Sequence, residues 1–210
     1  MVDFQSRNTR RDDEQADEPG DDDSPTEESP TDESTGGEHA DREDDHHHHH
    51  DVEQVGAAVL TVSSTRSLDD DPAGDAVAAA FEADGHEVVT RELVGDSYDR
   101  VQGAVDNLAS RGDVDVVVTA GGTGVTPDDV TVEAAEPLFD KTLPGFGELF
   151  RRLSYDEIGT KVVATRATAG VVDGALVFCL PGSEHAARLG SEEVVVPEIS
   201  HLVGLATREP

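Results

Sequence analysis

Three strand patterns, separated by two helical patterns, constrain the fold of this chain more than any other feature. The strands are predicted at Gly56–Val62 (GAAVLTV), Glu87–Leu93 and in DVVVTA at 115–120. Short apolar runs of this kind are typical of strands buried on both faces of a parallel sheet. A helix is expected between Asp71, as its cap, and Gly85, and another over 98–110. The alternation predicts an α/β fold, a three-layer α/β/α domain with a mostly parallel sheet.

The later part of the chain gives a less regular pattern. Thr131 is a plausible N-cap of a helix that extends to Phe139, and Asp173-Gly174 forms a turn between two strands. The remaining expected elements are a short helix in LPGFGELFRRLS, strands over Lys161–Thr168 and Ala175–Leu180, and a helix near the C-terminus.

The first fifty-one residues differ in composition from the rest. They are rich in Asp, Glu, Ser, Pro and Gly and nearly free of large apolar residues, so they cannot bury enough surface to offset the entropy of ordering. We therefore expect a disordered acidic N-terminal tail over 1–51 and one folded domain over 52–210. The run His46–His50 is an expression tag, a metal-collecting tract or neutral low complexity; a native, weakly metal-binding tract without catalytic role is favoured.

The formal net charge is −32 at pH 7, and Lys141 and Lys161 are the only lysines. Such a composition is typical of a cytoplasmic protein from a salt-loving microbe such as a halophilic archaeon, because at about 1 M salt the Debye length falls to roughly 3 Å and surface carboxylates repel little. The absence of a basic stripe argues against nucleic-acid binding. No apolar stretch of the sequence approaches the length of a membrane span. Cys179 lies in an apolar run and is expected to be a small core residue.

The stretch VTAGGTGVTPDDVT, from Val118 to Thr131, carries the clearest functional signal. Glycines after a buried strand let main-chain N–H groups approach a ligand, and such groups bind phosphate without net positive charge. A purely structural turn is the alternative. The residues expected to bind substrate here are Thr119, Gly121, Gly122, Thr123 and Gly124, with Lys161, Arg166 and Arg188 as sources of positive charge.

Ligands of such sheets bind beyond the carboxyl ends of the strands. Ser63 and Asp96 follow the first two strands, and they are expected at the same edge as the glycines. Pro181, Gly182 and Ser183 stand at a strand-to-helix junction, which makes them a second candidate anion site.

Asp128 and Asp129 close the glycine-rich stretch. Carboxylates beside a phosphate site repel the substrate unless a cation lies between them, so these residues and Asp96 suggest Mg²⁺. Helix capping is the alternative interpretation.

The segments GGTG, DVT, LPGFGE, IGT and LPGS occur in this order between about Gly56 and Leu205. In this the chain resembles the MoaB/MogA family of molybdenum cofactor biosynthesis. The resemblance implies Mg-ATP-dependent adenylylation of molybdopterin, with Asp96 and Asp129 catalytic and placing Mg²⁺. It also implies that Asp128 and Glu148 lie in the substrate site, that the protein is a homo-oligomer, either a trimer or a hexamer, and that other cofactor-biosynthesis proteins are possible partners.

Three departures from the family pattern leave an alternative open. Asp128 stands where the family commonly has Arg, Ser63-Ser64 where it has Ser-Asp, and Ala73-Gly74 where it has Ser-Gly. The alternative is a non-catalytic molybdopterin-binding protein of the same family. A competence-damage-inducible type of domain and a metal-handling protein that acts through the His run rank lower.

Overall fold

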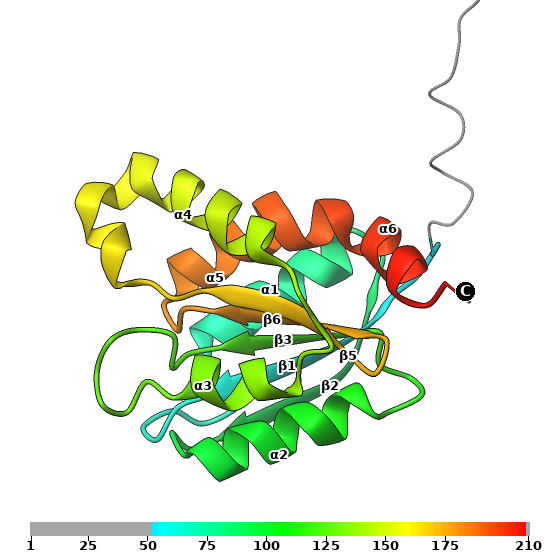
Figure 1. Ribbon diagram of the computed structural model, residues 1–210, viewed down its shortest axis with the longest axis horizontal. Helices are drawn as coiled ribbons and strands as arrows, with labels where there is room; N and C mark the ends of the chain where they lie inside the picture. The colour runs from blue at the N-terminus through cyan, green and yellow to red at the C-terminus, as the bar shows by residue number, and fades with distance from the viewer. Residues whose placement is uncertain (1–51, 209–210) are drawn as a thin grey trace, which may run out of the picture. The chain divides into compact units, whose positions relative to one another are not determined.

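The computed structural model describes residues 52–208. The expected acidic tail and the His run lie outside these residues. The described part is built on one six-stranded sheet with strand order β2-β1-β3-β6-β5-β4 (Figure 1). In chain order the elements are β1 (Gly56–Val62), α1 (Pro72–Ala83), β2 (Glu87–Val94), α2 (Tyr98–Ala109), β3 (Val116–Ala120), α3 (Thr131–Ala135), η2 (Glu136–Leu138), β4 (Lys141–Thr142), α4 (Pro144–Ile158), η3 (Gly159–Ala164), β5 (Thr168–Val172), β6 (Ala175–Leu180), α5 (Glu184–Gly190), the π-helical turn η4 (Ser191–Val195) and α6 (Val196–Ala206).

The sheet is mostly parallel, as predicted. β2, β1, β3 and β6 run in the same direction, whereas β5 and β4 pair antiparallel at one edge. The hairpin between β5 and β6 turns at Asp173 and Gly174, which both have positive φ. Because four neighbouring strands are parallel, their carboxyl ends share one edge of the sheet.

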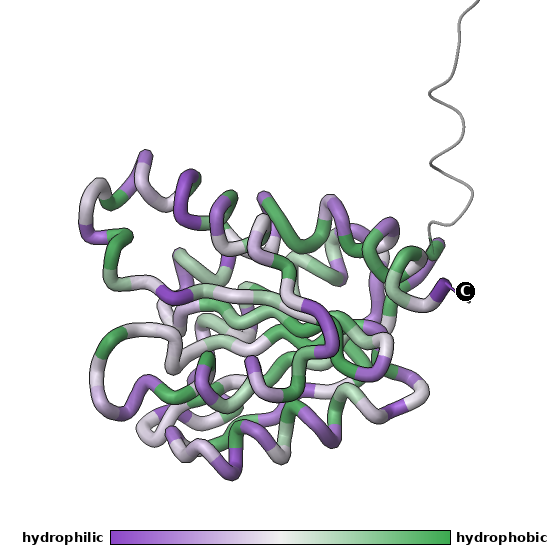
Figure 2. Tube along the Cα trace, viewed as in Figure 1, coloured by the Kyte–Doolittle hydropathy of each residue, from purple (hydrophilic) through white to green (hydrophobic). Residues whose placement is uncertain are grey.

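Helices cover both faces of the sheet, so the predicted three-layer arrangement is confirmed (Figure 1). Side chains alternate along β1: Ala57 and Val59 enter one core, and Ala58 and Leu60 enter the other. The first core packs against α1, α4, α5 and α6, and the second against α2 and α3. Figure 2 shows the hydrophobic sheet between helices with mixed surfaces. None of the helices formed by residues 52–208 is long and apolar enough to cross a membrane.

The prediction of a strand over Lys161–Thr168 is wrong. The chain forms the 3₁₀ helix η3 there, and the strand β5 begins only at Thr168. The β-branched residues Val162 and Val163 suggested a strand, but the Val163 side chain is 83% exposed. A strand needs a sheet face against which its apolar side chains can pack, and this segment has none.

Two helix boundaries also differ from expectation. Thr131 is the first residue of α3 rather than its cap, and its hydroxyl donates instead to the main-chain oxygen of Gly121 at 2.8 Å. The helix predicted in LPGFGELFRRLS ends four residues beyond that segment, at Ile158, and its end is marked by Gly159, which has a positive φ of 59°. The predicted cap Asp71 is confirmed, because its carboxylate accepts from the Gly74 N–H at 3.0 Å.

Candidate functional site

The segment that follows β3, residues 121–129 and hereafter the glycine loop, is wedged between the ends of β1 and β6. The Gly121 N–H donates to the main-chain oxygen of Leu180 at 2.9 Å. A Cβ atom on Gly121 would lie 2.2 Å from the main-chain oxygen of Val62, and Gly121 has φ of 118°. Only glycine satisfies both conditions without strain. The glycine loop is thereby fixed at the carboxyl edge of the parallel strands.

A second turn reaches the same place from β6. A Cβ atom on Gly182 would lie 3.0 Å from the Cα of Gly121, so the two turns are in close contact. Ser183 caps α5 by accepting a hydrogen bond from the Ala186 N–H at 3.3 Å. The two candidate anion-binding segments, which the sequence indicated separately, therefore lie side by side.

Between these turns and the end of α4 lies a cavity of about 340 Å³, hereafter the glycine-loop cavity. Six of the residues predicted to bind substrate line it, together with Asp129, which was predicted to be catalytic; the six are Gly122, Thr123, Gly124, Pro181, Gly182 and Ser183. The rest of its wall comes from α4, η3 and α5, namely Phe150, Ser154, Ile158, Lys161, Ala164, Thr165 and Ala186.

Several main-chain N–H groups beside this cavity are unused. Within residues 52–208, the N–H groups of Gly122, Thr123, Gly182 and Ser183 donate to no protein acceptor. Buried or cleft-lining N–H groups are strong donors that require a partner. Two turns that line one cavity thus hold main-chain donors without a protein acceptor in the described residues, an arrangement suited to an anion.

Asp129 is held in an ionised state at the cavity wall. Its carboxylate accepts from both the N–H and the hydroxyl of Thr126, each at 2.7 Å. Partial burial acts to raise the pKa of Asp129, but the hydrogen bonds from Thr126 and Gly124 and the charge of Arg166 outweigh it and hold the pKa below its usual range.

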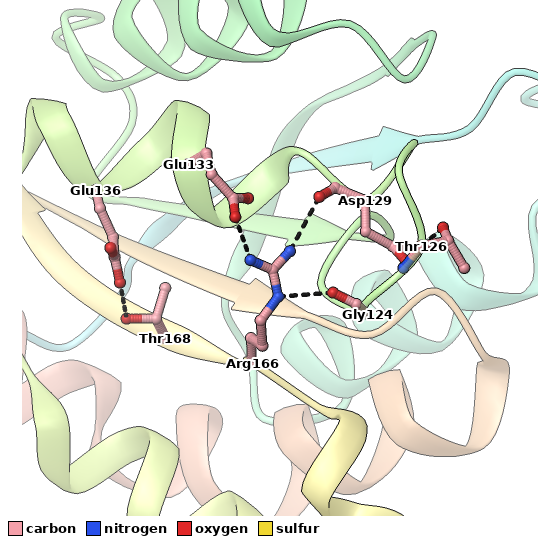
Figure 3. A network of polar contacts seen from close by, with 7 residues as sticks. All are labelled: Gly124, Thr126, Asp129, Glu133, Glu136, Arg166 and Thr168. Carbon is pink, nitrogen blue, oxygen red and sulfur yellow. Dashed lines mark hydrogen bonds and ion pairs between the residues drawn. The ribbon is translucent and has the colours of Figure 1, made fainter.

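Arg166 lies beside the glycine loop (Figure 3). Its guanidinium donates to the main-chain oxygens of Gly124 (2.6 Å) and Asp129 (2.9 Å) and forms an ion pair with Glu133. Its own N–H donates to the main-chain oxygen of Thr123 at 3.0 Å. The pKa of Glu133 is lowered chiefly by its hydrogen bond with Arg166. The sequence suggested Arg166 as a source of positive charge, but its polar contacts show that it binds the loop itself.

The other two residues predicted to supply positive charge, Lys161 and Arg188, differ in whether they line the cavity. Lys161 on η3 lines the glycine-loop cavity and is the one cationic side chain among the described residues of its wall. Arg188 does not line it, because its guanidinium forms ion pairs with Glu184 and Glu192 on the helix surface.

Ser63, which follows β1, and Asp96, which follows β2, do not line the glycine-loop cavity. Asp96 accepts from the Ser64 N–H at 2.7 Å, and its own N–H donates to the Ser64 hydroxyl at 3.1 Å. The Ser63 hydroxyl oxygen accepts from the N–H groups of Thr65 and Arg66. Both residues therefore organise the loops at the ends of β1 and β2, and neither lines the glycine-loop cavity.

Three further candidates are placed elsewhere. Thr119 is fully buried within β3, opposite Cys179 of β6. Asp128 is exposed at the tip of the glycine loop. Glu148 lines a different cavity, of about 560 Å³, together with Arg151 and the outer side of Arg166.

Asp96, Asp128 and Asp129 follow strands that end at the same edge of the sheet, but they do not form one cluster. In residues 52–208 no three His, Cys, Asp or Glu side chains are close enough to hold a metal ion. The topology gives the reason: β2 and β3 are separated by β1, so the loops that carry Asp96 and Asp129 start about 10 Å apart. A metal ion in the cavity would have Asp129 as its protein carboxylate.

The wall supplied by α4 was missed in the sequence. Phe150, Ser154 and Ile158 line the cavity and are spaced by four residues along the helix. This spacing places them on one face, so a longer predicted helix would have identified them.

Comparisons of the sequence with a family model and with known proteins indicate the same family. A family model described as a probable molybdopterin binding domain matches residues 58–201. Molybdenum cofactor biosynthesis protein B of Halalkalibacterium halodurans is 41% identical over 146 residues, which cover 69% of this chain and 86% of that protein.

Solved structures show the same similarity. A crystal structure of a molybdenum cofactor biosynthesis protein B has a TM-score of 0.72 and 39% identity, and the match covers 74% of this chain and 98% of that chain. The tungsten cofactor synthesizing protein MoaB from Pyrococcus furiosus has a TM-score of 0.67 and 36% identity, and the match covers 75% of this chain and 99% of that chain.

Proposed function

This chain belongs to the MoaB/MogA family of molybdenum cofactor biosynthesis proteins, and we propose that it acts there as a molybdopterin adenylyltransferase. The observation that carries the proposal is the pair of turns whose unused N–H groups meet at one cavity, between Gly122-Thr123 and Gly182-Ser183. Lys161 adds a positive charge at the wall. Such a site favours a phosphate-bearing ligand even though the net charge of the chain is −32.

The apolar part of the cavity wall suits the rest of molybdopterin. Phe150, Ile158, Ala164 and Ala186 provide apolar surface in the same cavity as the two turns. A ligand pocket commonly combines such surface with a few polar groups that fix orientation. The terminal phosphate would bind at the turns, and the flat pterin would lie against α4 and α5.

In the proposed reaction an oxygen of the terminal phosphate of molybdopterin attacks the α-phosphorus of ATP. A new P–O bond forms, the bond between the α-phosphorus and the oxygen that bridges to the β-phosphorus breaks, and pyrophosphate leaves with that electron pair. The attacking phosphate is already ionised near neutral pH, so no protein base is needed. The protein groups position the phosphates and stabilise the charge that develops on them.

The donor set fits Mg²⁺, which is commonly bound through one or two carboxylates together with substrate phosphates. Asp129 is ionised, lies at the wall and retains one carboxylate oxygen that does not contact Thr126. When bound, the ion would neutralise phosphate charge. Asp96 is proposed as a second catalytic residue by family resemblance, from its place at the end of β2.

Assembly into a trimer or hexamer is also proposed. Tyr155 and Ile158 on α4 and Val163 on η3 are 54%, 46% and 83% exposed, so apolar surface gathers at one end of the domain. Sedimentation at micromolar concentration tests this, and a stable monomer would contradict it.

The alternative is a molybdopterin-binding protein without catalysis. Asp128 favours it, because an exposed carboxylate at the tip of the glycine loop adds negative charge where ATP would bring more. One assay distinguishes the two functions. It measures the release of pyrophosphate from ATP in the presence of Mg²⁺ and molar KCl, with and without molybdopterin. Release that needs molybdopterin and is lost in Asp129→Ala supports the adenylyltransferase. Binding of molybdopterin without release supports the alternative.

A further inference from the structure

We propose that Arg166 is a positioning residue that holds the glycine loop with its main-chain oxygens turned toward Arg166 and away from the glycine-loop cavity. The ligand of that loop is taken from the proposed function, whereas the loop conformation is independent of it. Figure 3 shows the contacts on which the inference is based.

The three guanidinium contacts involve positions distant along the loop. Nε donates to the oxygen of Gly124 within the loop, one terminal nitrogen donates to the oxygen of Asp129 at its end, and the other pairs with Glu133 on α3. The main-chain N–H of Arg166 adds a bond to Thr123. One residue from the segment before β5 therefore ties both ends of the turn to each other and to the helix that follows.

The position of these contacts determines which main-chain groups of the loop are turned away from the glycine-loop cavity. Arg166 does not line the glycine-loop cavity; it lines two other cavities, one shared with Glu148 and one shared with Val125 and Glu133. The oxygens of Gly124 and Asp129 thus point toward the guanidinium. An oxygen turned toward the glycine-loop cavity would repel a phosphate, so this orientation keeps the oxygens of Gly124 and Asp129 away from the ligand. The Arg166 N–H holds the oxygen of Thr123 in the same way.

The first residues of the loop are fixed by the sheet edge and by Thr131. Between Gly124 and Val130, apart from the contacts with Arg166, the loop is held by contacts between Thr126 and Asp129: the Asp129 N–H donates to the Thr126 oxygen, and the Asp129 carboxylate accepts from Thr126. Val125 is 68% exposed and packs little. A loop ordered before binding spares the ligand the cost of ordering it, so loss of the guanidinium contacts is expected to weaken binding.

Lysine cannot replace arginine in this role. Each of the three guanidinium nitrogens reaches a different acceptor, a geometry that depends on a planar fork. An ammonium group retains the charge without the fork. Arg166→Lys therefore separates positioning from charge.

The test compares Arg166→Lys with wild type and with Arg151→Lys as a matched control. Arg151 also donates to a main-chain oxygen, that of Ala167 at 3.2 Å, but contacts no residue of the glycine loop. The measurements are affinity for inorganic tripolyphosphate in molar KCl, amide hydrogen exchange over 121–130, and thermal unfolding. In Arg166→Lys we expect affinity to fall by about tenfold or more and loop exchange to rise by about tenfold or more. Arg151→Lys should change neither.

Unchanged loop exchange and affinity in Arg166→Lys would overturn the inference. So would exchange that rises equally throughout the core, because Arg166 would then only stabilise the fold. If Arg166→Lys does not fold, Glu133→Gln serves in its place, since it removes the charge of one guanidinium partner, weakens that contact and should raise loop exchange in the same direction by a smaller factor. A wild type that binds no tripolyphosphate would contradict the proposed function, and loop exchange would still decide the role of Arg166.

Discussion

Gly124 and Asp129 are packed so closely that a Cβ atom on Gly124 would lie 2.7 Å from a carboxylate oxygen of Asp129. The third glycine of the loop thus makes room for the acid rather than for a turn, because Gly124 is not among the positive-φ glycines. The position of the proposed catalytic carboxylate depends on the absence of one methyl group.

Gly124→Ala should therefore displace Asp129 with little cost to the fold. We expect at least about a tenfold loss of molybdopterin-dependent pyrophosphate release, because misplaced catalytic groups commonly cost this much or more. Steady-state kinetics and thermal unfolding measure the two effects. Gly103→Ala on α2 is the control: a Cβ atom there meets nothing within 4 Å, so the helix should gain about 0.5–1 kcal/mol of stability with unchanged activity. Wild-type kinetics in Gly124→Ala would contradict the assigned role of Asp129.

The two lysines of the chain form a natural pair for testing charge at the cavity. Lys161 lines it, whereas Lys141 is exposed on β4 and does not. Lys161→Gln should weaken tripolyphosphate binding by about tenfold, since hydrogen bonds to charged groups are worth about 1.5–3 kcal/mol. Lys141→Gln changes the net charge equally and should leave the affinity as it is. Equal effects measured by calorimetry would mean that only the overall charge matters.

Acid should remove the stabilising contribution of Asp129. Because the pKa of Asp129 in the folded protein lies below its ordinary value of 3.8, this carboxylate stabilises the fold above that pH, and the contribution is lost as pH falls through the lowered pKa. Asp129→Asn should thus be less stable than wild type at pH 7, with a difference that narrows below pH 3.8. Denaturant unfolding at several pH values measures it. A difference independent of pH would show that ionisation of Asp129 does not contribute.

Cys179 should be chemically inert in the folded protein. It is fully buried in β6, and burial raises the pKa of its thiol to about 12. Since the thiolate is the reactive form, an aromatic disulfide reagent at pH 8 should label the protein only as it unfolds. The labelling rate should rise with denaturant. Rapid labelling of the native protein would contradict the burial of this strand.

The sequence predicts the part of this fold that depends on local pattern. The strand–helix alternation from Gly56 to Ala120 and the edge at which the loops meet follow from apolar runs and the direction of parallel strands. The segment after α4 was mispredicted because Val162 and Val163 have high strand propensity. Their conformation depends on tertiary packing, which local propensity does not contain.

The site too has a part that the sequence predicts and a part that only the fold reveals. Glycines, aspartates and the Pro181–Ser183 turn are visible as motifs, and the structure brings most of them to one cavity. The role of Arg166 was not predictable, because its acceptors are main-chain oxygens up to 42 residues away. Main-chain groups leave no trace in residue type, so only the fold identifies such a contact.

The most direct test of the proposed function is a crystal structure of the protein with molybdopterin bound. We predict that its terminal phosphate lies between the two turns, within hydrogen-bond distance of the N–H groups of Thr123 and Ser183, with the pterin against Phe150. A phosphate bound instead in the cavity of Glu148 and Arg151, or away from both turns, would contradict the assignment of the site.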